Sequence, residues 1–211
     1  EPGTRMPAWH PWAGPGLAAD APGNAHRSGR HTGFPVIPEK NLNRATVTRF
    51  YSAFAQLDPA SMATCYAPSV RFQDEVFTLD GRDQVMAMWF MLCESLHANG
   101  GRRDWKLNYR MVSVEPRQAR LEWSARYHFG KMQRPVHNRI QATLRFDEAG
   151  LITHHHDSFD FWRWSRQALG MPGVLLGWSP MLRRKVRARA QAGLARYMAE
   201  LQSHAVAHEK N

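Results

Sequence analysis

The chain has 211 residues, 43% of them hydrophobic, and a formal net charge of +10. This size suffices for one well-buried domain with extensions. No apolar run approaches the roughly 20 residues of a membrane-spanning helix, and the first residues lack the compact apolar stretch of a signal peptide. Cys65 and Cys93 are the only cysteines, and we expect them to be buried reduced thiols, as in a cytoplasmic protein.

The positive charge is concentrated towards the C-terminus. Residues 163–199 hold eight Arg or Lys and no Asp or Glu, so most of the net charge lies in this one segment. The basic residues follow a helical pattern that contains no known nucleic-acid-reading motif. We therefore do not expect nucleic acid as a partner.

Residues 1–40 contain seven of the thirteen prolines and six of the fifteen glycines, without sustained periodicity. This composition predicts an irregular or disordered arm. In an alternative interpretation the arm docks on the domain through Trp9, Trp12 and Phe34.

Apolar residues at helical spacing predict a first helix over residues 43–57; they are Val47, Phe50, Tyr51, Phe54 and Leu57. Asp58 and Pro59 end this helix and begin a short second one, whose apolar stripe is Met62, Cys65 and Tyr66. Alternation over residues 70–77 predicts a strand with Val70, Phe72 and Asp74 on one side. A third helix is expected over residues 81–96, ended by the Asn-Gly-Gly of residues 99–101.

The remaining pattern predicts four long strands. Alternating apolar residues mark strands over residues 105–111 and 121–129, and residues 136–164 predict two more strands joined by a tight turn at residues 147–150. One face of the last strand holds Thr153, His155, Asp157, Phe159 and Phe161. A buried carboxylate costs several kcal/mol unless it is paired or neutralised, so this face indicates a lined cavity rather than solid packing. The element order predicts an α+β fold, with helices on one face of a curved antiparallel sheet.

Four motifs carry a family resemblance. They are Val-Thr-Arg-Phe-Tyr-Ser-Ala-Phe at residues 47–54, Tyr-Ala-Pro-Ser-Val-Arg-Phe-Gln-Asp at 66–74, Leu-Arg-Phe-Asp-Glu-Ala-Gly-Leu-Ile at 144–152 and His-His-Asp at 155–157. In this order they resemble the nuclear transport factor 2-like superfamily, and within it the SnoaL-like proteins, over residues 41–165. The resemblance implies a cone-shaped domain in which a curved sheet and three helices enclose an apolar pocket, commonly in a homodimer formed through the sheet. Residues 166–211 depart from a minimal member and predict a basic amphipathic helical extension.

Ketosteroid isomerases belong to this superfamily, and Asp74 falls where they carry their general-base aspartate. The position of their oxyanion-binding tyrosine holds Phe50, and that of their second, protonated acid holds Ala142. Without these donors the enolate is not stabilised, so steroid isomerisation by that mechanism is excluded. Tyr51 or Tyr127 remains as an alternative donor.

Asp157 falls where SnoaL-type cyclases place their acid/base aspartate, and His155 lies two residues before it. Same-face neighbours on a strand are about 6.5–7 Å apart, so both side chains can reach one substrate atom. We expect Asp74 to be a third titratable group in the same pocket, since acid and imidazole groups in apolar surroundings suit proton transfer near neutral pH. The expected pocket wall is Phe50, Phe72, Trp89, Trp123, Tyr127, Asn138 and Phe159.

Structural interpretations stand beside these assignments. Asp157 can be a buried acid satisfied by Arg, Tyr or Trp donors, His155 a core histidine and Asp74 a surface residue. A metal site would need His154 and His156 with His128 or Asp160, because the middle histidine of the run points away from its neighbours. No motif for a metal, nucleotide, flavin, haem or phosphate appears, so we expect no cofactor.

The C-terminal segment also has two interpretations. Residues 170–180 are rich in apolar side chains, and the helix after them has a stripe of Leu182, Val186, Ala190, Leu194, Tyr197 and Leu201 beside five basic residues in its first turns. Either the helix packs on the domain or across a dimer, or the segment contacts an anionic membrane surface and makes the protein peripheral there.

Three classes of function follow. The first is an enzyme of cofactor-independent acid/base chemistry, such as isomerisation, cyclisation or hydration, acting on a small apolar molecule. The second is a non-catalytic module that binds a hydrophobic ligand or lipid. The third is an interaction domain whose pocket is filled by its own side chains.

Overall fold

The computed structural model describes residues 39–98 and 104–209. Their elements are α1 (Glu39–Ala55), α2 (Pro59–Ala63), β1 (Tyr66–Gln73), β2 (Thr78–Asp80), α3 (Arg82–Ala98), β3 (Lys106–Val114), β4 (Gln118–Phe129), β5 (Arg134–Phe146), β6 (Ile152–Phe159), α4 (Phe161–Leu169), α5 (Met171–Leu176) and α6 (Pro180–Glu209). The α+β class and the four long strands after α3 are as predicted. The expected arm falls, except for its last two residues, outside the described residues.

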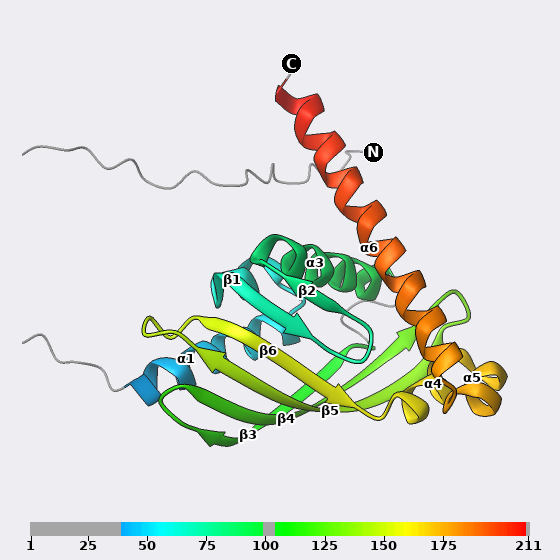
Figure 1. Ribbon diagram of the computed structural model, residues 1–211, viewed down its shortest axis with the longest axis horizontal. Helices are drawn as coiled ribbons and strands as arrows, with labels where there is room; N and C mark the ends of the chain where they lie inside the picture. Colours follow the sequence, from blue (N-terminus) through cyan, green and yellow to red (C-terminus); the bar gives the residue numbers. More distant parts are fainter. Residues whose placement is uncertain (1–38, 99–103, 210–211) are drawn as a thin grey trace, which may run out of the picture. The chain divides into compact units, whose positions relative to one another are not determined.

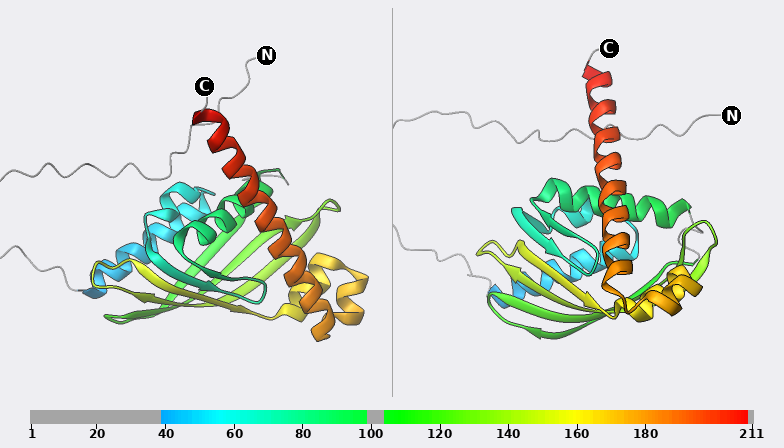
Figure 2. Two further views of the ribbon diagram at one scale, coloured as in Figure 1. Left: turned by 45° about the horizontal axis from the view of Figure 1, so that its top comes forward. Right: turned by 45° about the vertical axis from the view of Figure 1, so that its right-hand side comes forward.

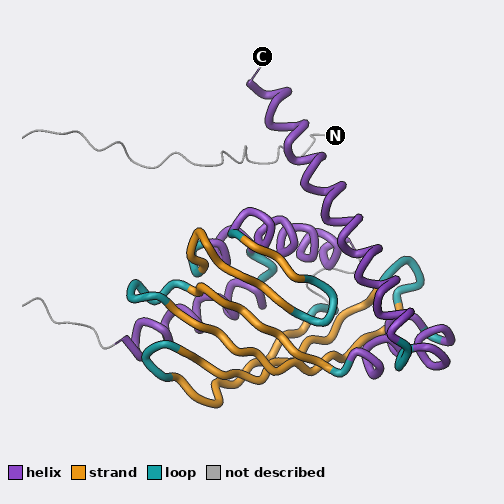
Figure 3. Tube along the Cα trace, viewed as in Figure 1, coloured by secondary structure: helices purple, strands orange, loops and turns teal. Residues whose placement is uncertain are grey.

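One six-stranded sheet has the order β2-β1-β6-β5-β4-β3, and α1, α2 and α3 lie on one face of it (Figures 1 and 2). The sheet is strongly curved, and its longest strands run side by side (Figure 3). All strand pairs are antiparallel except β1 and β6, which pair in parallel. This parallel pair brings the second motif of the sequence beside the fourth, with Phe72 opposite His155.

The core fills the space between the helices and the concave face of the sheet. From α1 it takes Val47, Phe50 and Phe54, which lie three and four residues apart and so share one helix face. Trp89 and Cys93 of α3 pack in the same core, and both cysteines are buried and unpaired. Even-numbered residues of β5 and odd-numbered residues of β4 face inward, as the alternation predicts.

The prediction for the segment after α2 was wrong about the type of element. Tyr66 was expected on a helix, but α2 ends at Ala63 and Tyr66 begins β1. The cause is tertiary: the amide of Ile152 donates a hydrogen bond to the carbonyl of Cys65 at 2.8 Å, which draws this segment against β6. The strand ends at Gln73, before the predicted Phe77, and Asp74 begins the loop to β2.

The last predicted strand was too long. β6 ends at Phe159, and Asp160 caps a new helix, α4, by accepting a hydrogen bond from the amide of Arg163 at 2.9 Å. Phe161 and Trp164 are buried against Val136 of β5. A short apolar run of this kind fits a strand and a helix equally well, and the cap decides between them.

Helix α6 packs its apolar stripe on the domain. Leu194 is buried in the main core with Tyr197 beside it, and the Tyr197 hydroxyl donates to Glu94 of α3 at 2.7 Å. Nearer its start, Arg183 forms a 2.8 Å ion pair with Glu75, and Arg187 Nε donates to the Glu75 carbonyl at 2.7 Å. The packing interpretation thus holds for Leu194 and Tyr197 of the stripe, whereas Leu201 is 40% exposed.

Helix α5 packs closely on α4 because glycines of the α5 segment face α4. A Cβ atom on Gly173 would overlap the carbonyl oxygen of Ser165, and one on Gly177 would overlap the Ser165 hydroxyl. Ser165 is fully buried, and its hydroxyl donates to the Trp162 carbonyl at 2.9 Å. Only glycine fits at these two positions while α5 stays docked.

We expect Gly173→Ala to lower the free energy of unfolding by about 1–3 kcal/mol, because the backbone contact between α4 and α5 cannot relax without separating the helices. Gly193→Ala is the matched control: this glycine lies within α6 with open space around its Cβ position, so the change should stabilise the protein by about 0.5–1 kcal/mol. Urea denaturation measures both. Equal effects of the two substitutions would contradict the contact.

Candidate functional site

His155 of β6 lies inside a shell of aromatic rings and is 1% exposed. Its imidazole centroid is 5.1 Å from the ring of Phe72, 5.5 Å from Phe50 and 6.1 Å from Trp89. The pairing of β1 with β6 places Phe72 directly beside His155, while α1 and α3 supply the other two rings. The imidazole is thus held in a fixed orientation by packing.

A chain of hydrogen bonds runs through this shell. Trp89 Nε1 donates to the Tyr66 hydroxyl at 3.1 Å, and that hydroxyl lies 2.6 Å from His155 Nδ1. His155 Nε2 lies 3.1 Å from Asp157 Oδ1, which also accepts a hydrogen bond from Trp123 Nε1 at 3.3 Å. With the imidazole proton on Nε2, Tyr66 donates to Nδ1 and Nε2–H donates to Asp157, so one arrangement of protons satisfies every contact.

Tyr51 is the exception among the buried polar groups. Its hydroxyl is the one fully buried side-chain polar atom without a hydrogen-bond partner in the described part of the chain. Burial raises the pKa of the Tyr51 hydroxyl well above its usual value, and the negative charge of Asp157 adds to the effect. The ring stacks on Tyr109 at 4.9 Å and lies 6.1 Å from Trp123. An unpaired buried hydroxyl costs about 1–3 kcal/mol, so this donor is kept at a cost in stability.

Asp74 stands at the edge of the same site. Its Oδ1 accepts hydrogen bonds from the amides of Val76 at 2.6 Å and Phe77 at 2.5 Å. Gln73 pairs with His156, and Asp74 follows Gln73 at the start of the loop to β2, close enough to Asp157 to feel its negative charge. Burial raises the Asp74 pKa to about 6, and the negative charge of Asp157 also raises it. The two amide hydrogen bonds act in the opposite direction and lower this pKa.

The expected wall residues divide into two groups. Phe50, Phe72 and Trp89 surround His155, and Trp123 contacts Asp157 directly. The others lie towards α4 or on the sheet: Tyr127 accepts a hydrogen bond from Trp164 Nε1 at 3.0 Å, Phe159 is 6.3 Å from the Trp164 ring, and Asn138 Oδ1 accepts from the Arg139 amide at 3.1 Å. The structure therefore brings together one part of the predicted wall with the predicted acid and imidazole.

Sequence reasoning missed Tyr66 and gave Tyr51 only as an alternative donor. Tyr66 was placed on a helix, and no local signal announces the parallel pairing that turns its hydroxyl towards His155. His154 and His156 are exposed on the other face of β6, as the alternation predicts. Among residues 39–98 and 104–209, no three His, Cys, Asp or Glu side chains are grouped as a metal site requires.

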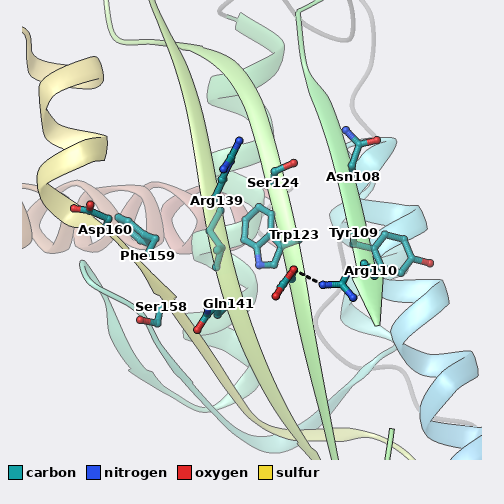
Figure 4. A pocket seen from close by; sticks show the side chains of 12 residues that line it. Asn108, Tyr109, Arg110, Trp123, Ser124, Arg139, Gln141, Ser158, Phe159 and Asp160 are labelled. Atoms are coloured by element: carbon teal, nitrogen blue, oxygen red, sulfur yellow. Dashed lines mark hydrogen bonds and ion pairs between the residues drawn. The ribbon is translucent and has the colours of Figure 1, made fainter. Parts of the chain in front are cut away.

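A hollow of about 650 Å³ lies on the outward face of the sheet. Figure 4 shows its side chains, which include Asn108, Arg110, Glu122, Ser124, Arg139, Gln141, Ser158 and Asp160. Arg110 and Glu122 form a 2.7 Å ion pair across two strands. Neither His155 nor Asp157 lines the hollow, but Trp123, which donates to Asp157, and Tyr109, which stacks on Tyr51, belong to its lining.

We expect Tyr66→Phe to lower the free energy of unfolding by about 1–3 kcal/mol, because it leaves Trp89 Nε1 and His155 Nδ1 without their shared partner. Tyr51→Phe is the matched control, since it removes a buried hydroxyl that has no partner. It should leave stability unchanged or raise it. Chemical denaturation of the two variants compares them, and a loss as large for Tyr51→Phe as for Tyr66→Phe would refute the assignment of the hydrogen-bond chain.

The family model for the SnoaL-like domain matches residues 47–155. Similar solved structures include a putative polyketide cyclase from Xanthomonas campestris (15% identity, 61% of this chain and 98% of that chain covered, TM-score 0.49). They also include an epoxide hydrolase from M. tuberculosis that resembles LEH (14% identity, 69% and 98% covered, TM-score 0.47). None of the curated proteins matches the sequence significantly. Because the family model spans more than half of the sequence, the chain belongs to the SnoaL-like domain family.

Proposed function

We propose that this protein binds a small apolar molecule beside Asp157 and performs acid/base chemistry on it without a cofactor, as an isomerase, cyclase or hydratase. One observation carries the proposal: a buried carboxylate is hydrogen-bonded to a buried imidazole, and the unpaired hydroxyl of Tyr51 lies within range of its charge. Structural packing alone gives no reason to keep an unpaired donor beside a buried acid.

Asp157 is the proposed general acid/base. Among the described residues, both hydrogen bonds that it receives end on Oδ1, which leaves Oδ2 to face a ligand. Oδ2 would accept a proton from a carbon or from water and return it at another position of the ligand. His155 and Tyr66 would hold the carboxylate in place and spread the change in charge along their hydrogen bonds.

Tyr51 is the proposed donor to the oxyanion. Proton removal from the carbon next to a carbonyl places negative charge on the carbonyl oxygen. In an epoxide the same charge arises on the oxygen when water, losing its proton to the base, attacks carbon and the C–O bond breaks. A preorganised hydroxyl donor stabilises either charge. The Tyr51 hydroxyl is held by stacking on Tyr109 and is free of any described protein acceptor. It would take the role that ketosteroid isomerases give to a tyrosine at the position of Phe50 in this chain.

The ligand class follows from the surroundings. Phe50, Phe72 and Trp89 present aromatic surface around His155, and Trp123 does so beside Asp157. Such surroundings favour an apolar molecule that carries one polar group, by which the molecule is oriented in the site. We propose that the ligand enters past Asp74, because Asp74 is half-buried whereas Asp157 is buried. Tyr127 lies near Asp74 and is held by the hydrogen bond from Trp164 of α4.

The tight enclosure of His155 favours a second candidate, an interaction domain whose interior is filled by its own aromatic side chains. A non-catalytic module for an apolar ligand or lipid would use the same interior as the enzyme. We further propose a cytoplasmic homodimer formed through the outward face of the sheet, following the family's common arrangement.

Mass spectrometry of small molecules extracted from the purified protein identifies the ligand. With that ligand we expect Asp157→Asn to abolish turnover and to leave affinity within a few-fold, because the amide fills the same space without accepting the proton. His156→Gln on the exposed face of β6 is the control and should retain full activity. Unchanged turnover in Asp157→Asn would reject the enzyme, and an extract without any bound molecule would favour the filled interior.

Tyr51→Phe should lower turnover of the same ligand by about 100-fold or more, because one oxyanion donor is lost. Its stability should not fall, since the hydroxyl has no protein partner. Steady-state kinetics and thermal denaturation of one preparation measure the two effects together. Full turnover by Tyr51→Phe would remove Tyr51 from the mechanism.

Asp74 predicts a dependence of stability on pH. In the folded state Asp74 keeps its proton up to about pH 6, whereas the ordinary pKa of an Asp is 3.8. The contribution of Asp74 to stability is therefore greatest below about pH 4 and is lost as the pH rises through 6. Asp74→Asn keeps an acceptor for both amides and removes this loss. The free energy of unfolding of Asp74→Asn, relative to that of the natural protein, should rise by about 1–2 kcal/mol between pH 4 and 7. This figure is reduced for the partial exposure of Asp74. Urea denaturation across this range measures it, and an advantage independent of pH would contradict the raised pKa.

A further inference from the structure

The end of the molecule formed by α4, α5 and the start of α6 exposes an unusual amount of apolar surface. Of eleven exposed large hydrophobic residues in the described part of the chain, seven form what we call the apolar tip: Trp162, Met171, Val174, Leu175, Leu176, Trp178 and Met181. Trp178 is 71% exposed and Leu175 62%. Figures 1 and 2 show α5 at the periphery, beside the first turns of α6.

The exposure follows from how α5 is docked. Its glycines, Gly173 and Gly177, face α4, so the larger side chains between them point away from the protein. Residues 171–178 read Met-Pro-Gly-Val-Leu-Leu-Gly-Trp and contain no charged side chain. The surface of a soluble protein rarely carries a large contiguous apolar patch unless that patch is an interaction site.

Basic residues surround the apolar tip. The basic collar, as we call it, consists of the exposed residues Arg163, Arg166, Arg184, Lys185 and Arg189. The Arg166 guanidinium lies 4.6 Å from the centre of the Trp162 ring. Met181 lies three and four residues before Arg184 and Lys185, so these side chains share one face of α6. Residues 161–199 include no Asp or Glu; the nearest acids, Asp160 and Glu75, respectively cap α4 and pair with Arg183.

We propose that the apolar tip inserts into the surface of a membrane rich in anionic lipid, with the basic collar at the headgroups. A six-residue helix is about 9 Å long, which suits shallow insertion at the boundary between headgroups and acyl chains. No helix in the described residues is long and apolar enough to cross a membrane. The inference is independent of the chemistry proposed for Asp157.

The collar selects this occupant over another copy of the chain. A symmetric contact between two apolar tips would bring two all-basic collars together, and like charges would oppose it. An anionic bilayer satisfies both parts of the surface, because each basic residue near it gains attraction and each apolar side chain leaves water. The stripe of α6 does not compete for the membrane, since Leu194 and Tyr197 pack on the domain.

Vesicle flotation of the full chain tests the proposal, with phosphatidylcholine alone or mixed with phosphatidylglycerol. The natural protein should bind the mixed vesicles and bind phosphatidylcholine at least tenfold more weakly. Leu175→Glu combined with Trp178→Glu should weaken binding to mixed vesicles by about 100-fold. Arg184→Glu with Lys185→Glu should weaken it by at least tenfold and remove the preference for anionic lipid.

Leu201→Glu is the matched apolar control, because Leu201 is 40% exposed on α6 and lies twenty residues beyond Met181. Arg44→Glu with Arg49→Glu is the matched charge control, because both arginines are exposed on α1. Both controls should bind as the natural protein does. Equal binding of neutral and mixed vesicles, or no binding at all, would overturn the proposal. Concentration-dependent self-association that Leu175→Glu abolishes would do so as well, by assigning the tip to a contact between copies.

Discussion

The burial of Asp157 and His155 beneath aromatic side chains is the constraint on which the rest of the site depends. A carboxylate and an imidazole removed from water are tolerated only if their hydrogen bonds are made within the protein. Tyr66, Trp89 and Trp123 supply them from β1, α3 and β4. The curved sheet, the parallel pairing of β1 with β6 and the docking of α3 are therefore coupled to one another through a single polar chain.

The C-terminal helices connect this interior to the surface. Trp164 of α4 contacts the Tyr127 hydroxyl and the Phe159 ring, and Arg183 of α6 holds Glu75, the neighbour of Asp74. The same three helices present the apolar tip and its basic collar to the outside. The extension thus packs against the edge of the buried site with one side and offers an unpartnered surface with the other.

The amino-acid pattern predicted the fold class, the long strands and the inward direction of His155 and Asp157, because alternation with a period of two is strong in these strands. It failed at Tyr66 and at Phe161, where short apolar segments fit either type of element and a distant strand or a capping residue decides. The expected apolar surroundings of Asp74 agree with its raised pKa. The unpaired hydroxyl of Tyr51 could not be predicted, since it depends on neighbours distant in sequence.

The central claim is that Tyr66, His155 and Asp157 act as one buried hydrogen-bonded unit. Nitrogen NMR of the histidine side chains, with the His155 signals assigned by their loss in His155→Gln, tests it most directly. If the three residues form such a unit, His155 has a single tautomer with the proton on Nε2, that proton exchanges slowly with water, and the signal changes in Tyr66→Phe. A His155 signal that averages both tautomers and exchanges as fast as that of exposed His156 would contradict it.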